Sequence, residues 1–182
     1  MASLSDGVAT LRQLRIDDVA AVTAACQDPE MVRWTASIPS PYTEQNAIDW
    51  ITGLPAKWHE GRVASFAVVD ATSDELWGNF SIGVKDWTRR EGSVGYWVAA
   101  PQRSQGVATR ALELGVAWAF GELALDALHL ETLLDNVASE RVAQKGGFDL
   151  VEVAYDVRVP SRLDRTFDLK RWRRGRESGV AS

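Results

Sequence analysis

The clearest periodic pattern in the chain lies at residues 106–122, where apolar side chains recur at helical spacing. The residues of this apolar face lie three or four positions apart: Val107, Ala111, Leu114 and Trp118, widened by Leu112, Val116 and Ala119. An apolar stripe this broad is typical of a helix that packs on a sheet. We therefore predict a long amphipathic helix that covers one face of a β-sheet.

Short runs rich in β-branched and aromatic residues predict the strands of that sheet. Three runs, at residues 62–70, 75–85 and 92–100, are separated by turn-like segments and predict an antiparallel meander. Further strands are predicted at residues 8–15, 127–135, 148–157 and 162–172. Strands therefore lie on both sides of the long helix in the sequence.

Two helices are predicted before the meander. Asp17 opens the first, which runs to about Cys26, because a carboxylate suits the positive end of a helix. The second begins near Thr43. We expect Gly53 and Pro55 to bend it or to divide it into two short helices, because both residues interrupt helical structure.

A last helix is predicted at residues 137–146, which gives the order βααβββαβαββ. This order indicates an α+β fold with a mixed, mostly antiparallel central sheet flanked by helices. No internal repeat and no low-complexity linker interrupts the chain. We predict one domain over residues 1–172, followed by a short, basic, flexible tail at residues 173–182.

The composition is that of an ordinary globular protein, with 182 residues of which 46% are hydrophobic and 25% charged. No apolar run is long enough to span a bilayer, and the N-terminus lacks the pattern of a signal peptide. The single cysteine, Cys26, excludes an internal disulfide and fits a reducing compartment. We expect a cytoplasmic protein without a membrane segment, either a monomer or a homodimer.

The charge is distributed unevenly around a net value of −5. Without the last 13 residues the chain has 15 basic and 24 acidic residues, a net charge of −9. An acidic body attracts cationic substrates such as amines and makes nucleic acid an unlikely partner. The basic segment at residues 170–176 could touch RNA or phosphate, but a run this short is more typical of a solvated tail.

The strand at residues 92–100 is followed by Pro101 and by small or polar residues, before the long helix begins near Gly106. The first N–H groups of a helix have no partner within it, and the helix dipole favours negative charge there. A phosphate could approach the backbone at Gly106 and Ala108, and Arg103 could add a charge-assisted contact. Taken alone, the pattern also fits an ordinary loop between a strand and a helix.

A second motif, "DNVASERVAQKGGF" at residues 135–148, follows the next strand. Asn136 can cap the helix that begins there, and Gly146 and Gly147 can end it. Together with "GYWVAAPQRSQGVATRALELGVAWAF", this motif resembles the acyl-CoA-binding core of the GNAT acyltransferase superfamily. The chain resembles most the branch that acetylates the N-terminal serine or alanine of ribosomal proteins, over most of residues 8–172.

The resemblance implies how acyl-CoA would bind. The backbone of four consecutive residues would hold the pyrophosphate, with Arg103 nearby: Gln105, Gly106, Val107 and Ala108. The strand around three others would pair with the pantetheine arm like an added strand: Tyr96, Trp97 and Val98. Asn136 would hydrogen-bond the pantetheine, and Ser139 lies where this branch has a serine near the departing sulfur.

The chain departs from the wider superfamily at two positions. Ala143 replaces the tyrosine that acts as general acid in many members, so Ser139 becomes the candidate for that role. Ser93 replaces a glutamate that acts as general base, and Glu91 lies two residues earlier on the same face of the predicted strand. We expect Glu91 to take the proton through a bridging water, although a solvated residue at a strand start is an equal alternative.

The missing base bears on the kind of amine that can react. An amine must lose its proton before it attacks, which at pH 7 costs a lysine about 4.6 kcal/mol and an α-amine about 1.1 kcal/mol. A site without a strong base therefore favours the α-amine of a peptide or protein.

Candidates for contact with the acceptor are aromatic residues in segments that would border its groove: Trp34, Trp50, Trp87 and Tyr155. Eight tryptophans are many for this length, and most of them would pack in the core. The two histidines show no metal-ligand spacing, so no metal is predicted.

The sequence thus predicts an enzyme that transfers an acyl group, by default acetyl from acetyl-CoA, directly to a primary amine. Two alternatives stay open. The acceptor could be a small amine, such as an aminoglycoside or a polyamine. The protein could instead be a non-catalytic acyl-CoA-binding module, because both the usual tyrosine and the usual glutamate are missing.

Overall fold

The computed structural model describes residues 3–35, 38–158 and 166–176. Eight strands form one sheet in the order β1-β2-β3-β4-β5-β6-β8-β7. Their bounds are Leu4–Ser5, Ala9–Gln13, Val63–Asp70, Leu76–Asp86, Glu91–Val98, Ala127–Leu133, Asp149–Arg158 and Thr166–Gly175 for β1 to β8. Among the described strands only β5 and β6 pair in parallel, so the sheet is mixed and mostly antiparallel, as predicted.

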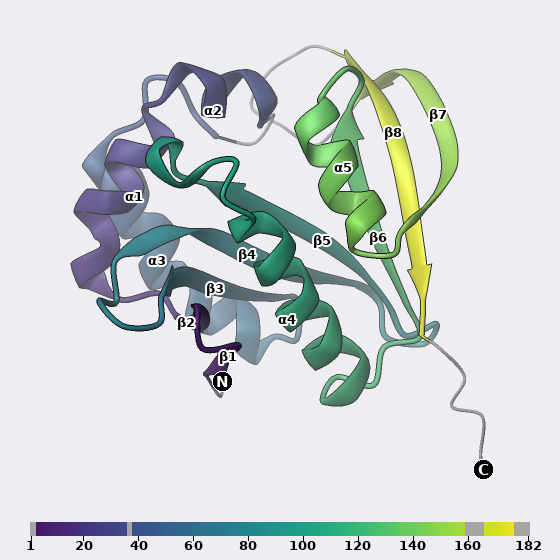
Figure 1. Ribbon diagram of the computed structural model, residues 1–182, viewed down its shortest axis with the longest axis horizontal. Helices are drawn as coiled ribbons and strands as arrows, with labels where there is room; N and C mark the ends of the chain where they lie inside the picture. Colours follow the sequence, from purple (N-terminus) through teal and green to yellow (C-terminus); the bar gives the residue numbers. More distant parts are fainter. Residues whose placement is uncertain (1–2, 36–37, 159–165, 177–182) are drawn as a thin grey trace.

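Five α-helices accompany the sheet within the described residues. They are α1 (Val19–Cys26), α2 (Pro29–Trp34), α3 (Glu44–His59), α4 (Val107–Gly121) and α5 (Val137–Lys145). Helices α4 and α5 lie in front of the sheet in Figure 1, and α1 and α3 lie behind it. The sheet therefore separates two layers of helices, which fits the predicted α+β fold.

Each face of the sheet has its own apolar core. The larger cluster lies under α4 and includes Phe66, Phe80 and Leu112, none of them exposed to solvent. The smaller cluster lies under α1 and α3 and includes Val22 and Ile51. Because side chains alternate along a strand, neighbouring residues of one strand enter different cores.

Helix α3 differs from the prediction, because it continues through Gly53 and Pro55 without a break. Its buried residues Ala47, Ile51 and Leu54 follow helical spacing and pack toward the smaller core. Burial of this apolar face outweighs the hydrogen bond that Pro55 removes.

Short elements were missed by the sequence pattern. Helix α2 has six residues and starts with Pro29 at its first turn, where Asp28 accepts a hydrogen bond from the Glu30 N–H. Strand β1 has two residues. At the other end, β8 continues to Gly175, so the first residues of the predicted tail belong to the sheet, and residues 177–182 lie outside the described part.

None of the helices in the described part of the chain has both the length and the apolar character that crossing a bilayer requires. Within residues 3–35, 38–158 and 166–176, no three His, Cys, Asp or Glu side chains gather in an arrangement that could hold a metal ion.

The contact between α4 and the sheet depends on a glycine. A Cβ added at Gly115 would lie 2.0 Å from Cε1 of Phe80, a fully buried ring on β4. Real Cβ atoms do not approach a ring this closely, so any side chain at this position pushes α4 away from the sheet.

We predict that Gly115→Ala lowers the free energy of unfolding by about 2 kcal/mol, because it overpacks the core. Gly121→Ala is the matched control, since a Cβ there meets nothing within 4 Å and alanine favours the same helix. Urea denaturation of both variants measures the difference. Equal stabilities of the two variants would contradict the close packing of α4.

Candidate active site

The only parallel pair in the described sheet ends halfway along its strands. Strands β5 and β6 are paired from Glu91 and Ala127 to Val94 and Leu130. Beyond this point β5 stays with β4 as far as Val98, and β6 stays with β8 as far as Leu133. The two strands therefore part, and a wedge opens through the middle of the sheet.

Backbone groups of β5 face this wedge without a partner strand. The Ala99 N–H donates to the Trp77 carbonyl on β4 at 2.8 Å. Because N–H groups alternate sides along a strand, those of Tyr96 and Val98 point the other way, toward β6. The wedge is thus bordered by an open strand edge that can bind an extended chain.

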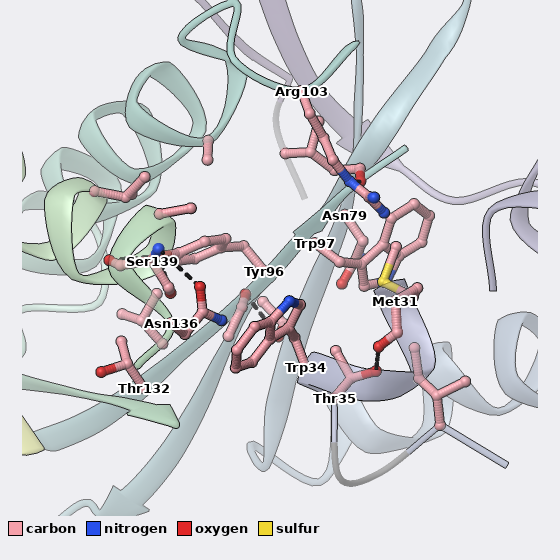
Figure 2. A pocket seen from close by; sticks show the side chains of 18 of the residues that line it. Met31, Trp34, Thr35, Asn79, Tyr96, Trp97, Arg103, Thr132, Asn136 and Ser139 are labelled. Atoms are coloured by element: carbon pink, nitrogen blue, oxygen red, sulfur yellow. Dashed lines mark hydrogen bonds between the residues drawn. The ribbon is translucent and has the colours of Figure 1, made fainter. Parts of the chain in front are cut away.

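A groove of about 1160 Å³ runs through the wedge and continues on both faces of the sheet. Its lining on the α4 and α5 side includes Tyr96, Thr132, Asn136 and Ser139. We call this part the coenzyme half. Figure 2 shows Ser139, Asn136 and Thr132 on one side of the groove, across from Met31, Trp97 and Thr35.

The part of the groove on the α1 and α3 side is the acceptor half. Its lining includes Trp34, Trp50, Trp97, Asn79, Asp49 and Glu131. Tyr96 packs against the larger core and Trp97 against the smaller one, so two consecutive residues of β5 face different halves. The groove thus gives two molecules access to the same point on β5 from opposite sides.

The loop before α4 borders the coenzyme half. Gly106 caps α4 with φ of +81°, a left-handed conformation that favours glycine. A Cβ at Gly106 would meet nothing within 4 Å, so the space in front of the helix N-terminus is open. The first N–H groups of α4 have no carbonyl partner within the helix, and they can bind an anion there.

Arg103 is already engaged at this loop. Its Nη2 donates to Oδ2 of Asp28, the residue that caps α2, and its Nε donates to the Val98 carbonyl at 3.1 Å. The predicted contact with a phosphate would have to compete with this ion pair. The Gln105 side chain donates from Nε2 to the Pro101 carbonyl at 2.8 Å.

Two hydroxyl groups meet in the coenzyme half. Tyr96 on β5 and Ser139 on α5 share a hydrogen bond of 2.7 Å between their side-chain oxygens. Burial raises the pKa of Tyr96 to about 12, against the opposing effect of the hydrogen bond with Ser139, so the phenol stays protonated at neutral pH. Asn136 caps α5 by accepting the Ser139 N–H at 3.1 Å, and this holds Ser139 in place.

The wedge and the two-sided groove agree with the family that the sequence matches, the acetyltransferase (GNAT) domain, over residues 9–149. The chain belongs to the GNAT acetyltransferase family. The resemblance inferred from the sequence is thus confirmed, and the protein is an acyl-CoA-dependent N-acyltransferase by family.

Known proteins with a similar sequence or fold agree. The chain is 26% identical over 138 residues to YoaA, an uncharacterized N-acetyltransferase of Bacillus subtilis strain 168. The matched region covers 76% of this chain and 77% of YoaA. RimJ of Mycobacterium smegmatis, solved with CoA-disulfide, has a similar fold, with a TM-score of 0.83, 24% identity and coverage of 100% of this chain and 89% of that one.

The ribosomal-protein-S5-alanine acetyltransferase of Vibrio fischeri also has this fold, with a TM-score of 0.83, 16% identity and 98% coverage of both chains. At such identities the two solved structures show the fold alone.

The structure places some predicted site residues away from the groove. Trp87 donates from Nε1 to the Gly61 carbonyl at 2.9 Å and is half exposed, and Tyr155 lies exposed on the edge strand β7. Neither borders the groove, whereas Trp34 and Trp50 do. Two of the four aromatic candidates for acceptor contact therefore line the groove.

Glu91 also lies apart from the groove, because it starts β5 at the closed end of the wedge. Its Oε2 is 3.4 Å from Nε2 of His129. The groove lining on β5 begins at Val94, so Glu91 is on the expected face but too early in the strand. The expectation that Glu91 reaches the amine through one water does not fit this placement.

The sequence pattern missed several residues of the groove: Asn79, Glu131, Thr132, Arg141 and Lys145. The last two lie on α5 and add positive charge to the coenzyme half. Arg141 and Lys145 are four residues apart, a spacing that could have suggested that they lie on the same face of a helix. No local signal marks the others, which enter the groove only through strand pairing.

We predict that Gly106→Ala weakens coenzyme A binding at least tenfold, since the loss of one charge-assisted contact of about 1.5 kcal/mol suffices. The new Cβ would enter the open space before α4 and strain the backbone. Gly7→Ala controls for the strain alone, because Gly7 has φ of +85°, nothing within 4 Å, and no place in the groove. Calorimetric titration measures both affinities, and equal weakening in both variants would contradict phosphate binding at this loop.

Proposed function

We propose that the protein transfers an acetyl group from acetyl-CoA to the α-amine of a peptide or protein N-terminus by direct attack on the thioester. The observation that carries this proposal is the groove that crosses the sheet where β5 and β6 part. It lets a coenzyme on one face and an amine on the other reach Tyr96, Trp97 and Val98 together.

Charges along the groove support this division. Arg141 and Lys145 line the coenzyme half, which suits the phosphates of coenzyme A, and Arg103 lies in the loop that borders it. Glu30, Asp49 and Glu131 line the acceptor half with one lysine, Lys57, so carboxylates prevail there and attract a cationic amine.

The open edge of β5 supports a role in both binding and chemistry. The N–H groups of Tyr96 and Val98 would pair with the pantetheine arm, which lies along the strand as an added strand would. The Val98 N–H would then also reach the thioester carbonyl and stabilise the negative oxygen that forms as the amine nitrogen attacks. The alternation of N–H groups along β5 supports this role, because it directs the Val98 N–H toward the wedge.

Ser139 and Tyr96 would handle the leaving group. When the C–S bond breaks, the thiolate gains a proton and the new amide nitrogen loses one. If Tyr96 donates its hydrogen to the Ser139 oxygen, the Ser139 hydroxyl is free to donate to the departing sulfur. A pKa of about 12 keeps the Tyr96 phenol protonated and able to support Ser139 in this way.

Removal of the proton from the attacking amine needs less help from the protein than protonation of the leaving thiolate. An α-amine needs little help from a base, and Glu131 is the carboxylate that lines the groove beside the wedge. Its Oε1 accepts from Nε of Arg171 at 3.0 Å, so its charge is held at the acceptor half. The name of the ribosomal-protein-S5-alanine acetyltransferase that shares this fold supports a protein as the acceptor.

The direct test follows the release of the free coenzyme A thiol with acetyl-CoA and a panel of amines. The panel holds peptides that begin with serine or alanine, the same peptides with a blocked N-terminus and one lysine, polyamines and aminoglycosides. We expect turnover with the free peptide N-termini and at least tenfold less with the blocked lysine peptides. Turnover only with the small amines would contradict the proposed acceptor, and coenzyme A binding without any turnover would favour a binding module.

We predict that Ser139→Ala lowers kcat at least tenfold with little change in the KM for acetyl-CoA, since general acid catalysis contributes 10²–10⁴-fold. Tyr96→Phe should lower kcat less, because it removes only the support for Ser139. Glu91→Gln is measured in parallel and should lose less than threefold. A wild-type kcat for Ser139→Ala would contradict the proposed proton donor, and a larger loss for Glu91→Gln would restore Glu91 as a participant.

A further inference from the structure

Asn79 is a buried amide at the floor of the acceptor half. It lies on β4 directly opposite Trp97 of β5, and its side chain therefore faces the same side of the sheet as Trp97. Only 4% of the residue is exposed, yet it lines the groove. A polar side chain this deeply buried needs partners, and only some of its polar groups have them.

The partners of Asn79 fix the orientation of its amide. Its Nδ2 is 2.7 Å from the Phe66 carbonyl and 2.9 Å from Oγ of Ser65, both on β3. A backbone carbonyl can only accept a hydrogen bond, so the nitrogen of the amide must face it. The carbonyl oxygen Oδ1 is consequently directed away from Phe66.

The Oδ1 atom of Asn79 has no hydrogen-bond partner among the described residues, whereas its Nδ2 has two. It is not sealed from solvent either. In the described part of the chain, Nε2 of His129 is the one side-chain nitrogen or oxygen that is both fully buried and without a hydrogen-bond partner. Oδ1 of Asn79 has no partner, so it cannot be fully buried. Oδ1 of Asn79 therefore retains contact with the open space of the groove. It is an oriented acceptor whose partner must come from there.

We infer that Oδ1 of Asn79 accepts a hydrogen bond from the amine nitrogen of the acceptor and positions that nitrogen for attack. The inference rests on the proposed function and adds a residue to it. Asn79 and Trp97 are cross-strand partners, and neighbouring strands lie about 4.8 Å apart. An amine held above this pair lies on the acceptor face of β5, the strand whose Val98 N–H faces the wedge.

The chemistry of an amide suits this position better than that of a carboxylate. The attacking nitrogen needs a free lone pair, so it must be neutral. A carboxylate beside it would stabilise the ammonium form and raise the pKa of the amine. A neutral carbonyl oxygen accepts one N–H and carries no net charge, so it orients the amine without holding the extra proton as strongly. Asn79 is a positioning residue in this scheme, and the proton leaves toward the more open side of the groove.

The test compares Asn79→Leu with Asn79→Ser and with Ser65→Ala. Leucine has a similar size but no oxygen, and serine keeps an oxygen on a shorter side chain. Ser65→Ala is the matched control, because it removes one partner of Nδ2 and leaves Oδ1 and the Phe66 contact intact. Steady-state rates with peptides that begin with alanine and with serine give the KM for the amine and for acetyl-CoA separately.

We expect both Asn79 variants to raise the KM for the amine at least tenfold with both peptides. The KM for acetyl-CoA should stay within twofold of the wild type, and Ser65→Ala should leave both constants within threefold. Coenzyme A titration shows that each variant is folded. An unchanged amine KM in folded Asn79→Leu or Asn79→Ser overturns the inference. A rise in the amine KM that is confined to the serine peptide also overturns it, because Oδ1 would then bind the side-chain hydroxyl of that serine.

A second measurement does not depend on turnover: tryptophan fluorescence reports the binding of the peptide in the presence of coenzyme A. Weaker binding to Asn79→Leu than to the wild type supports the role of Oδ1 even where turnover fails, and equal binding overturns it. Absence of turnover in the wild type contradicts the proposed function alone. The two failures are therefore distinguishable.

Discussion

The site depends on one constraint of the sheet, the parting of β5 and β6 after Val94 and Leu130. These strands are parallel and need a crossover, which α4 provides. While they stay paired, their backbone groups satisfy one another, and where they part, the edge of β5 is left open at Tyr96 and Val98. The groove and its access from both faces follow from this geometry. A sheet paired along its full length would have neither.

The alternation of side chains along β5 connects the two halves of the groove. Tyr96 enters the coenzyme half and meets Ser139, and Trp97 enters the acceptor half opposite Asn79. Arg103 provides a second connection, because its side chain joins the end of β5 to Asp28 at the start of α2. The wall of the acceptor half is thus attached to the same loop that would hold the phosphates.

Local sequence patterns were sufficient for the sheet, the long helix and the loop before it. Period-two runs and a broad apolar stripe depend only on neighbouring residues, and Gly106 caps α4 where the sequence predicted the helix to begin. Helix α2 is too short to show a period, and Pro55 carries no sign that the packing of Ile51 would outweigh it. The alternation of side chains along a strand was enough to deduce which face of the sheet Glu91 lies on. Its distance from the wedge depends on the residue at which β6 stops pairing with β5.

Contacts between distant segments explain the rest of what the sequence did not reveal. Arg103 meets Asp28 across 75 positions, and Asn79 meets Ser65 only because β3 and β4 pair in one register. The hydroxyl chemistry shows the same dependence. Ala143 is fully buried in the larger core, so a tyrosine there would have to displace core packing. In the proposed scheme the hydroxyls come instead from Ser139, one turn earlier on α5, and from Tyr96 on β5. A local motif can show that a residue is missing, but only the fold shows which distant residue can take its place.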